Sequence, residues 1–379
     1  MIRKLIIILL SLTVVIFGSD GAMDLLEKVN QIIADFKSER QIDARETVFA
    51  VRADMQDSKI VLRGEISKIE LKNDLLLKIA DALKVEPQDR LTVLPDPSLG
   101  EKIYGIVKVP VINLMDGPRK TSQKNAVTQA RMGELVTILK QSDEWYLVQM
   151  EDSYLGWVEG KNLHITDKTG LNDYLAHKFV LVTSKFAVIF KSMDEHDQLQ
   201  EKLVQGTVLP YLKTDGEWTL AQLPDSERIY LRTSNLEFFN SRAEVFSIKK
   251  GANYVINVAK QHLGLPYLWA GTTSFGFDCS GFTQFCFKMA GYFLRRDADM
   301  QFNQGKVIED RSNLLPGDLV FFQTYKPGPS HVGIYIGGMK YIHSGSNGVA
   351  INSFDPTSSD YSESLDRKYI GARRIIGGE

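Results

Sequence analysis

Residues 266–282 read PYLWAGTTSFGFDCSGF, and the end of this stretch predicts both a helix and a reactive cysteine. Apolar residues recur at helical spacing beyond it, at positions 282, 285, 286 and 289, so the pattern predicts a helix that begins at or beside Cys279. Unpartnered backbone N–H groups and the positive end of the helix dipole favour a thiolate over a thiol at such a position. We therefore expect Cys279 to be a nucleophile.

The sequence has one other cysteine, Cys286, two helical turns after the first. Two turns separate the Cα atoms of the two cysteines by roughly 10 Å, which is beyond the reach of a disulfide. Cys286 falls on the apolar side of the predicted helix, so we expect it to pack as a small hydrophobic residue. A cysteine that remains a free thiol in an exported protein is expected to have a chemical role.

Two histidines follow in residues 314–345, LLPGDLVFFQTYKPGPSHVGIYIGGMKYIHSG, which predict three strands. A two-residue turn at positions 337–338 would put His331 and His343 on opposite faces of a hairpin. A three-residue turn that includes Met339 would put both imidazoles on one face. We expect the three-residue turn.

With that register, His331 can act as base and acid for Cys279, while His343 lies behind it and fixes its tautomer and orientation. A cysteine, a histidine and a polar third residue in this order follow the logic of cysteine proteases. One cysteine and two histidines could instead hold zinc. The paired close spacings of a structural zinc site do not occur here, so we expect no metal and no cofactor.

The first 22 residues are typical of a signal peptide, with Arg3 and Lys4 ahead of an apolar run at 5–17 and small residues after it. An apolar run of about 13 residues is too short to cross a bilayer of about 30 Å as a stable helix, although an uncleaved anchor is the alternative. We expect an exported protein, periplasmic or extracellular and associated with the cell wall, with no stable membrane span after cleavage.

Residues 23–100 predict a small α+β module. A helical pattern at 23–45 is followed by two alternating runs, a second helical pattern and a short strand, and the linker PDPSLG at 95–100 closes the unit. The module contains no group of residues that suggests chemistry.

Between 104 and 240 the sequence repeats itself at an offset of 73, which pairs Gly133 with Gly206 and Trp145 with Trp218. Short alternating runs in both copies predict two small all-β domains, 104–166 and 176–242. The formal net charge of −2 gives no reason to expect nucleic acid as a partner, and a monomer that binds an uncharged or mixed-charge ligand is the simplest expectation.

The motifs PYLWAGTTSFGFDCSGF, LLPGDLVFF, HVGIYIG and YIHS together resemble the NlpC-type family of papain-like cell-wall peptidases, and the first β copy resembles a bacterial SH3 barrel. The resemblance implies a multidomain protein with a small α+β N-terminal module, two SH3-like β-barrels and an α+β papain-like cysteine peptidase domain at 250–379. It also implies that Cys279 is the nucleophile, His331 the base and His343 the third polar residue.

The order of domains is similar to that of γ-D-glutamyl-L-diamino-acid endopeptidases, which implies a substrate with a free N-terminal L-Ala. By this resemblance Tyr267 lies near the oxyanion site, and Asp278, Ser280 and Tyr154 contact the substrate amine. Asn125 stands where an acidic residue is expected. A neutral amide replaces a carboxylate only weakly against an ammonium, so either Asp278 binds the amine alone or the selectivity is relaxed.

The leading hypothesis is hydrolysis of the bond between γ-D-Glu and a diamino acid in peptidoglycan stem peptides or released muropeptides, through a thioester on Cys279. An amidase or acyltransferase that uses the same nucleophile is one alternative. A non-catalytic wall-binding protein, in which the β domains are the working part, is another.

Overall fold

The computed structural model describes residues 19–57, 59–119 and 122–378, which divide into two compact units at Asp96 and Pro97. The apolar run of the expected signal peptide lies outside the described residues. Among the helices of this described part, none is both long and apolar enough to cross a membrane.

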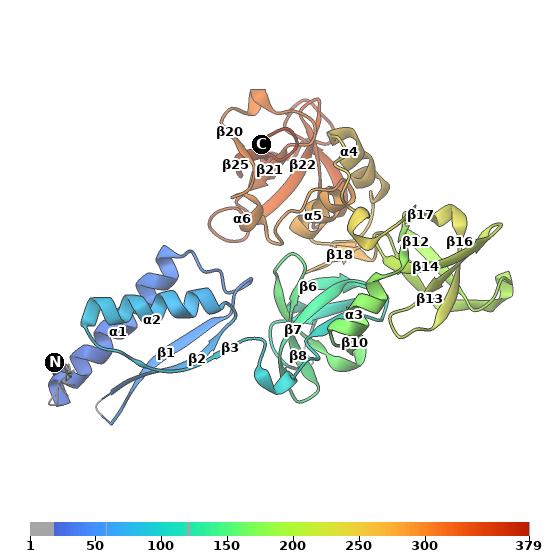
Figure 1. Ribbon diagram of the computed structural model, residues 1–379. Coiled ribbons are helices and arrows are strands. Elements are labelled where there is room, and N and C mark those ends of the chain that lie inside the picture. Colours follow the sequence, from blue (N-terminus) through green and yellow to red (C-terminus); the bar gives the residue numbers. More distant parts are fainter. Residues whose placement is uncertain (1–18, 58, 120–121, 379) are drawn as a thin grey trace, which may run out of the picture. The chain divides into compact units, whose positions relative to one another are not determined.

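The N-terminal unit is the expected α+β module (Figure 1, blue). Its three-stranded sheet has the order β1-β2-β3, with β1 antiparallel and β3 parallel to β2. Both helices pack on the sheet around a core that includes Val29, Phe36 and Leu75. The elements are α1 (Ser19–Glu39), β1 (Phe49–Gln56), β2 (Lys59–Ile66), α2 (Ile69–Leu83) and β3 (Gln88–Val93).

The second unit starts with two β domains of the same topology. The first has the strand order β10-β4-β7-β8-β9-β5-β6. Its strands are β4 (Tyr104–Val107), β5 (Val111–Met115), β6 (Ala126–Arg131), β7 (Leu135–Ser142), β8 (Trp145–Met150), β9 (Leu155–Glu159) and β10 (Leu163–Thr166).

Helix α3 (Lys168–Leu175) leads to the second β domain, whose order is β13-β12-β16-β15-β14-β11-β17. The offset of 73 maps one order onto the other strand by strand, so the repeat seen in the sequence is confirmed. The strands are β11 (Lys178–Val182), β12 (Phe186–Phe190), β13 (Gln198–Val204), β14 (Val208–Asp215), β15 (Trp218–Gln222), β16 (Arg228–Arg232) and β17 (Leu236–Phe239). Over the residues described, each is an open seven-stranded sheet rather than a closed barrel.

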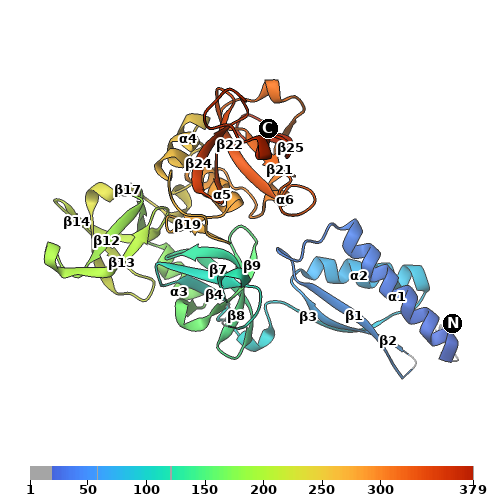
Figure 2. The ribbon, with the colours of Figure 1, turned by 180° about the vertical axis from the view of Figure 1, so that it is seen from behind.

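The C-terminal domain is α+β, with a six-stranded antiparallel sheet of order β20-β25-β21-β22-β23-β24. The helix α5 (Cys279–Met289) contacts β22 and β23, and α4 (Ala252–Gln261) packs beside α5, as Figure 2 shows from behind. The strands are β20 (Lys306–Ile308), β21 (Leu319–Phe322), β22 (His331–Gly337), β23 (Lys340–Gly345), β24 (Gly348–Ser353) and β25 (Tyr369–Arg374).

Three short elements complete the C-terminal domain: the hairpin of β18 (Thr272–Thr273) and β19 (Gly276–Phe277), and the helices α6 (Ala298–Gln301) and α7 (Glu363–Asp366). Apolar side chains of α5 fill the core against the sheet, and Cys286 is completely buried among them. Both cysteines are free thiols. The packing role expected for Cys286 is therefore confirmed.

Candidate active site

Helix α5 begins at Cys279 because the residues around it satisfy the first turn. Asp278 has extended backbone dihedrals, and its Oδ1 accepts a hydrogen bond from the backbone N–H of Gly281 at 2.6 Å, as an N-cap residue does. A Cβ on Gly281 would lie 2.2 Å from the carbonyl oxygen of Gly271, so the helix start packs against the preceding loop only with glycine there. The expected position of Cys279 at a helix N-terminus is confirmed.

The hairpin of β22 and β23 places both histidines on one face. Ile334 pairs with Ile342, and Tyr335 pairs with Tyr341, which is the register that the three-residue turn predicts. The expected turn length is nevertheless wrong.

The structure pairs Gly337 with Lys340, so the turn has two residues, Gly338 and Met339, and an irregularity before Gly337 restores the register. Both turn residues have left-handed φ values, +59° for Gly338 and +60° for Met339, which suit a type I′ hairpin turn.

The two imidazoles are hydrogen-bonded to each other. His331 Nε2 lies 2.8 Å from His343 Nδ1, and His343 Nε2 lies 2.8 Å from the side-chain oxygen Oδ1 of Asn352 on β24. All three side chains are buried or half-buried. These ring nitrogens therefore form a line of hydrogen bonds and do not converge on a common point as zinc ligands would.

One cavity of about 720 Å³ joins the expected catalytic groups. Cys279, His331, His343 and Tyr267 line it, together with polar residues of the loops at 345–348 and 362–364. The structure thus brings together four of the residues singled out from the sequence.

Burial controls the charge state of these groups. Removal from water raises the pKa of the Cys279 thiol to about 12, and the negative charge of Asp278 adds to this, while hydrogen bonds from the backbone of Val332 and Ser280 act in the opposite direction. Burial also lowers the pKa of His331 to about 3. Desolvation of the thiol thus opposes the effect of the helix N-terminus, which favours a thiolate. Both shifts favour the uncharged forms, a thiol and a neutral imidazole.

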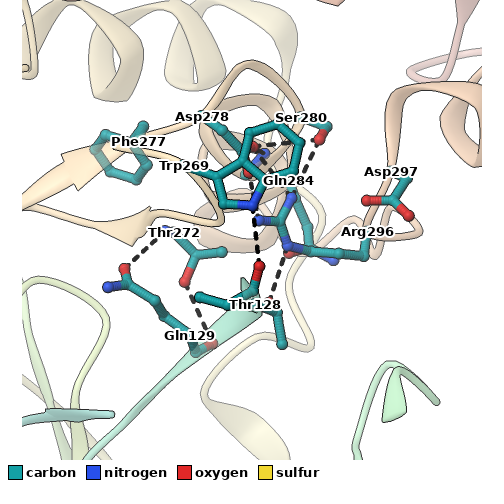
Figure 3. A network of polar contacts seen from close by, with 12 residues as sticks. Thr128, Gln129, Trp269, Thr272, Phe277, Asp278, Ser280, Gln284, Arg296 and Asp297 are labelled. Atoms are coloured by element: carbon teal, nitrogen blue, oxygen red, sulfur yellow. Dashed lines mark hydrogen bonds and ion pairs between the residues drawn. The ribbon is translucent and has the colours of Figure 1, made fainter. Parts of the chain in front are cut away.

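Asp278 and Ser280 belong to a second, ionic group beside the cysteine (Figure 3). Arg296 is 1% exposed and donates to both carboxylate oxygens of Asp278, at 2.6 Å and 3.1 Å, and to the hydroxyl of Ser280 at 3.1 Å. Its Nε donates to the hydroxyl of Thr128, on β6 of the first β domain, at 2.9 Å. The residue expected to bind an amine is thus already paired with a buried cation.

Tyr154 reaches the same region from the turn between β8 and β9. Its hydroxyl donates to Asp297 Oδ2 at 2.9 Å, and Asp297 directly follows Arg296 in the chain. Asp152 holds the turn, since Oδ1 accepts from the backbone N–H of Tyr154 at 3.0 Å and Oδ2 accepts from Gln284 of α5 at 2.9 Å. The structure therefore places Tyr154 against the C-terminal domain.

Residues 264–374 match the NlpC/P60 family, and residues 114–163 match the bacterial dipeptidyl-peptidase SH3 domain. A γ-D-glutamyl-L-lysine dipeptidyl-peptidase of Bacillus cereus is 33% identical over 266 residues, which cover 68% of this chain and 77% of that protein. The chain belongs to the NlpC/P60 family.

Two further comparisons agree with this assignment. A γ-D-glutamyl-L-lysine dipeptidyl-peptidase of Bacillus subtilis is 32% identical over 250 residues, 63% of this chain and 78% of that protein. The crystal structure of an NlpC/P60 family protein from Bacillus cereus superposes with a TM-score of 0.62 at 28% identity, and covers 72% of this chain and 99% of that one.

The NlpC/P60 domain contacts the first β domain along strand β6. The indole N–H of Trp269 donates to the carbonyl oxygen of Ala126 at 3.0 Å, and the side-chain oxygen of Gln129 accepts from the backbone N–H of Thr272 at 3.0 Å (Figure 3). Arg131 also donates to the carbonyl oxygen of Thr272. The first β domain is therefore hydrogen-bonded to the segment that precedes the cysteine.

Asn125 immediately precedes β6, and its Nδ2 donates to Asp116 Oδ2 at 2.9 Å. Sequence reasoning missed Arg296, Asp297 and Asn352. The sequence did contain a signal for Asn352. Side chains of a strand alternate between the two faces of a sheet, so every second residue of the strand after His343 lies on the same face as His343. The other two follow α5 in an irregular segment, where no periodicity points to them.

A further cavity of about 330 Å³ lies where the two β domains meet the NlpC/P60 domain. Five of the six charged groups that line it are paired with one another: Glu134 with Arg131 and Lys288, and Glu151 with Arg242, while Asp152 accepts hydrogen bonds from Tyr154 and Gln284. The ion pairs link the first β domain to α5 and to the segment after β17, so the cavity belongs to the packing of the domains.

Proposed function

We propose that this protein is a cysteine peptidase that hydrolyses the bond between γ-D-Glu and a diamino acid in peptidoglycan stem peptides or muropeptides. The observation that carries the proposal is the alignment of Cys279, His331 and His343 in one cavity at the start of α5. Membership of the NlpC/P60 family and the names of the relatives support the substrate class.

In this mechanism the Cys279 thiol gives its proton to His331 as the sulfur attacks the substrate carbonyl carbon. We expect Tyr267, which lines the same cavity, to donate a hydrogen bond to the oxyanion. His331 then protonates the leaving amine, and a thioester remains on Cys279. Water, deprotonated by His331, hydrolyses the thioester and restores the thiol.

Selectivity for a free N-terminal amine is the next part of the proposal. Asp278, Ser280 and Tyr154 were expected at the amine, and Tyr154 is hydrogen-bonded to Asp297. Asp297 accepts the hydrogen bond of Tyr154, so we infer that it is a second carboxylate of the amine site beside Asp278.

The domain limits and the location are also proposals: a signal peptide at 1–22, the α+β module at 23–100, SH3 domains at 104–166 and 176–242, and the peptidase domain at 250–379. Relatives include a probable peptidoglycan endopeptidase of Bacillus subtilis, LytE, which supports a cell-wall location. Sequencing the N-terminus of the mature protein tests the cleavage site, and detection of uncleaved protein in the membrane fraction alone would contradict cleavage at 22.

The function is tested by mass spectrometry of digests of L-Ala-γ-D-Glu-L-Lys and its diaminopimelate counterpart, each with a free or an acetylated N-terminus. We expect release of L-Ala-γ-D-Glu from the free peptides, loss of cleavage in Cys279→Ala, and slow cleavage of the acetylated peptides. Intact free peptides would refute peptidase activity, and transfer to an added amine in preference to water would favour an acyltransferase.

Asp297→Asn tests the amine site. We expect a higher KM for the free peptides and a smaller difference between free and acetylated forms, because the charge opposite the ammonium is gone. Asp310→Asn, an exposed carboxylate of the same domain that caps a short helix, is the matched control. Equal kinetics in both variants would remove Asp297 from the site.

A further inference from the structure

Strand β24 places Asn352 directly behind His343. In the antiparallel pair of β23 and β24, His343 faces Ala350 and Tyr341 faces Asn352, so the side chains of His343 and Asn352 are diagonal neighbours on one face. The resulting contact, from His343 Nε2 to Asn352 Oδ1, is 2.8 Å long. A line of hydrogen bonds thus runs from His331 through His343 to a neutral amide.

The amide of Asn352 can have only one orientation. Its Nδ2 lies 3.0 Å from the backbone carbonyl oxygen of Asp360, and a carbonyl oxygen can only accept a hydrogen bond. The NH₂ group must therefore face Asp360, which leaves the amide oxygen toward His343. The Asp360 loop is itself held, because its carbonyl also accepts from the backbone N–H of Ser353 at 2.9 Å and its side chain pairs with Lys340 at 2.7 Å.

This orientation fixes the protons of both imidazoles. Since the amide oxygen of Asn352 can only accept, His343 Nε2 must carry a hydrogen. A neutral imidazole then has a bare Nδ1, which can only accept from His331 Nε2–H across 2.8 Å. His331 is left with a bare Nδ1, the nitrogen that can take the proton of the Cys279 thiol.

We propose that Asn352 is a positioning residue which sets His331 in the tautomer that can deprotonate Cys279. The proposal rests on the peptidase function proposed above. An amide turned the other way would make Nε2 of His343 the acceptor and Nδ1 the donor, and His331 would then present an N–H to the sulfur instead of a lone pair. The orientation of the Asn352 amide thus decides whether His331 can accept the proton of Cys279.

Substitutions at 352 separate this role from a structural one. Asn352→Leu keeps the approximate size but removes the acceptor, so both tautomers of His343 become accessible and kcat falls by about tenfold to hundredfold, as for other residues that orient a functional imidazole. Asn352→Asp keeps an acceptor but adds a negative charge, which favours the doubly protonated form of His343. That form donates from Nδ1 and excludes the competent tautomer of His331.

The Asn352→Asp variant should therefore be active at high pH. As the pH is lowered, its activity should begin to fall at a higher pH than that of the wild type. The titratable side chains that contact His343 within the described residues are His331 on β22 and Tyr341 on its own strand, while Asn352 approaches from β24. No carboxylate or cation is among these contacts. A new carboxylate at 352 is thus the dominant charge that His343 meets.

The experiment measures tautomers directly, by two-bond ¹H–¹⁵N correlation spectra of the protein labelled with ¹⁵N-histidine, with His331→Gln and His343→Gln spectra for assignment. We expect the Nε2–H pattern for both histidines in the wild type and a loss of that single pattern for both in Asn352→Leu. An Nδ1–H pattern for His331 in the wild type, or unchanged patterns in Asn352→Leu, would overturn the proposal.

Kinetics supply the second readout. The acid limb of kcat/KM should move to higher pH in Asn352→Asp, whereas Asn352→Leu should lower the plateau. Lys340→Met is the control, since it loosens the Asp360 loop without touching an imidazole, and its acid limb should stay in place. A shift of equal size in Lys340→Met would assign the effect to the loop. Cys279→Ala tests the peptidase function separately, because the tautomer spectra do not depend on turnover.

Discussion

Replacement of Arg296 by methionine should destabilise the NlpC/P60 domain strongly. The aliphatic part of the side chain is retained, but the guanidinium that pairs with Asp278 at 2.6 Å is lost from a position that is 1% exposed. Removal of one partner from a buried ion pair costs about 3–5 kcal/mol, because the other charge stays buried without compensation. At about 2–4 °C per kcal/mol, the melting temperature should fall by roughly 10 °C.

A double-mutant cycle isolates the pair. Asp278→Asn removes the charge but keeps the helix cap, since asparagine is as good an N-cap as aspartate. Each single variant leaves one buried charge, whereas the double variant leaves none, so it should lose less than the sum of the two by about 2 kcal/mol or more. Urea unfolding followed by circular dichroism measures the four free energies of unfolding.

The control is Arg367→Met in the same domain, where the arginine side chain is 77% exposed and its partner Glu363 is 62% exposed. Such a surface pair contributes about 0–1 kcal/mol, so a small change is expected. If the effects of Arg296→Met and Asp278→Asn simply add within about 0.5 kcal/mol, the two residues are not coupled and the reasoning fails.

Three further results are expected. The rate at which iodoacetamide alkylates Cys279 should rise steadily through alkaline pH, because burial raises the pKa of its thiol to about 12, while Cys286 should stay unmodified. Mass spectrometry measures both rates. A rate for Cys279 that is flat from pH 5 to 9 would instead indicate a resting thiolate. His262 is completely buried, and burial lowers its pKa from 6.5 to about 4. The unfolded state therefore binds more protons, and the free energy of unfolding should fall by on the order of 3 kcal/mol as the pH drops from 6.5 to 4. His262→Phe should reduce this pH dependence in urea titrations, and an unchanged pH dependence would contradict the assignment. Gly333→Ala would place a methyl group 3.0 Å from the Cβ of His343. A displacement of a catalytic group by about 1 Å can lower the rate about 100-fold, so kcat should fall by about tenfold while the fold is unchanged. Full activity would show that the strand adjusts without moving the imidazole.

Local signals were enough to predict the start of α5 and the repeat of the β domains. Asp278, Cys279 and the apolar period after them describe a helix start within a few residues, and the cap found in the structure uses these same residues. The strand order of the two β domains agrees because one fixed offset relates every strand of the first to one of the second. Features that depend on residues close together in the sequence can be predicted from sequence patterns.

The charge state of Cys279 and the partners of Asp278 depend instead on residues distant in the chain. Burial of the thiol results from the packing of α5 against β22 and β23, and it opposes the effect of the helix N-terminus on the pKa of Cys279. Arg296 meets Asp278 across 18 positions, which include α5 and the irregular segment that follows it. The two-residue turn at Gly338 was missed because a compensating irregularity in β22 gives the same register.

The hydrogen bond from Arg296 to Thr128 has a consequence for recombination of these domains. A buried guanidinium of the NlpC/P60 domain completes its hydrogen bonds with a hydroxyl from another domain, 168 positions earlier in the chain. A chimera that moved residues 264–374 alone would carry this group without its acceptor, at a cost of about 1.5–3 kcal/mol for a lost bond to a charged group. The unit that can be exchanged between proteins is therefore the peptidase domain together with its first β domain.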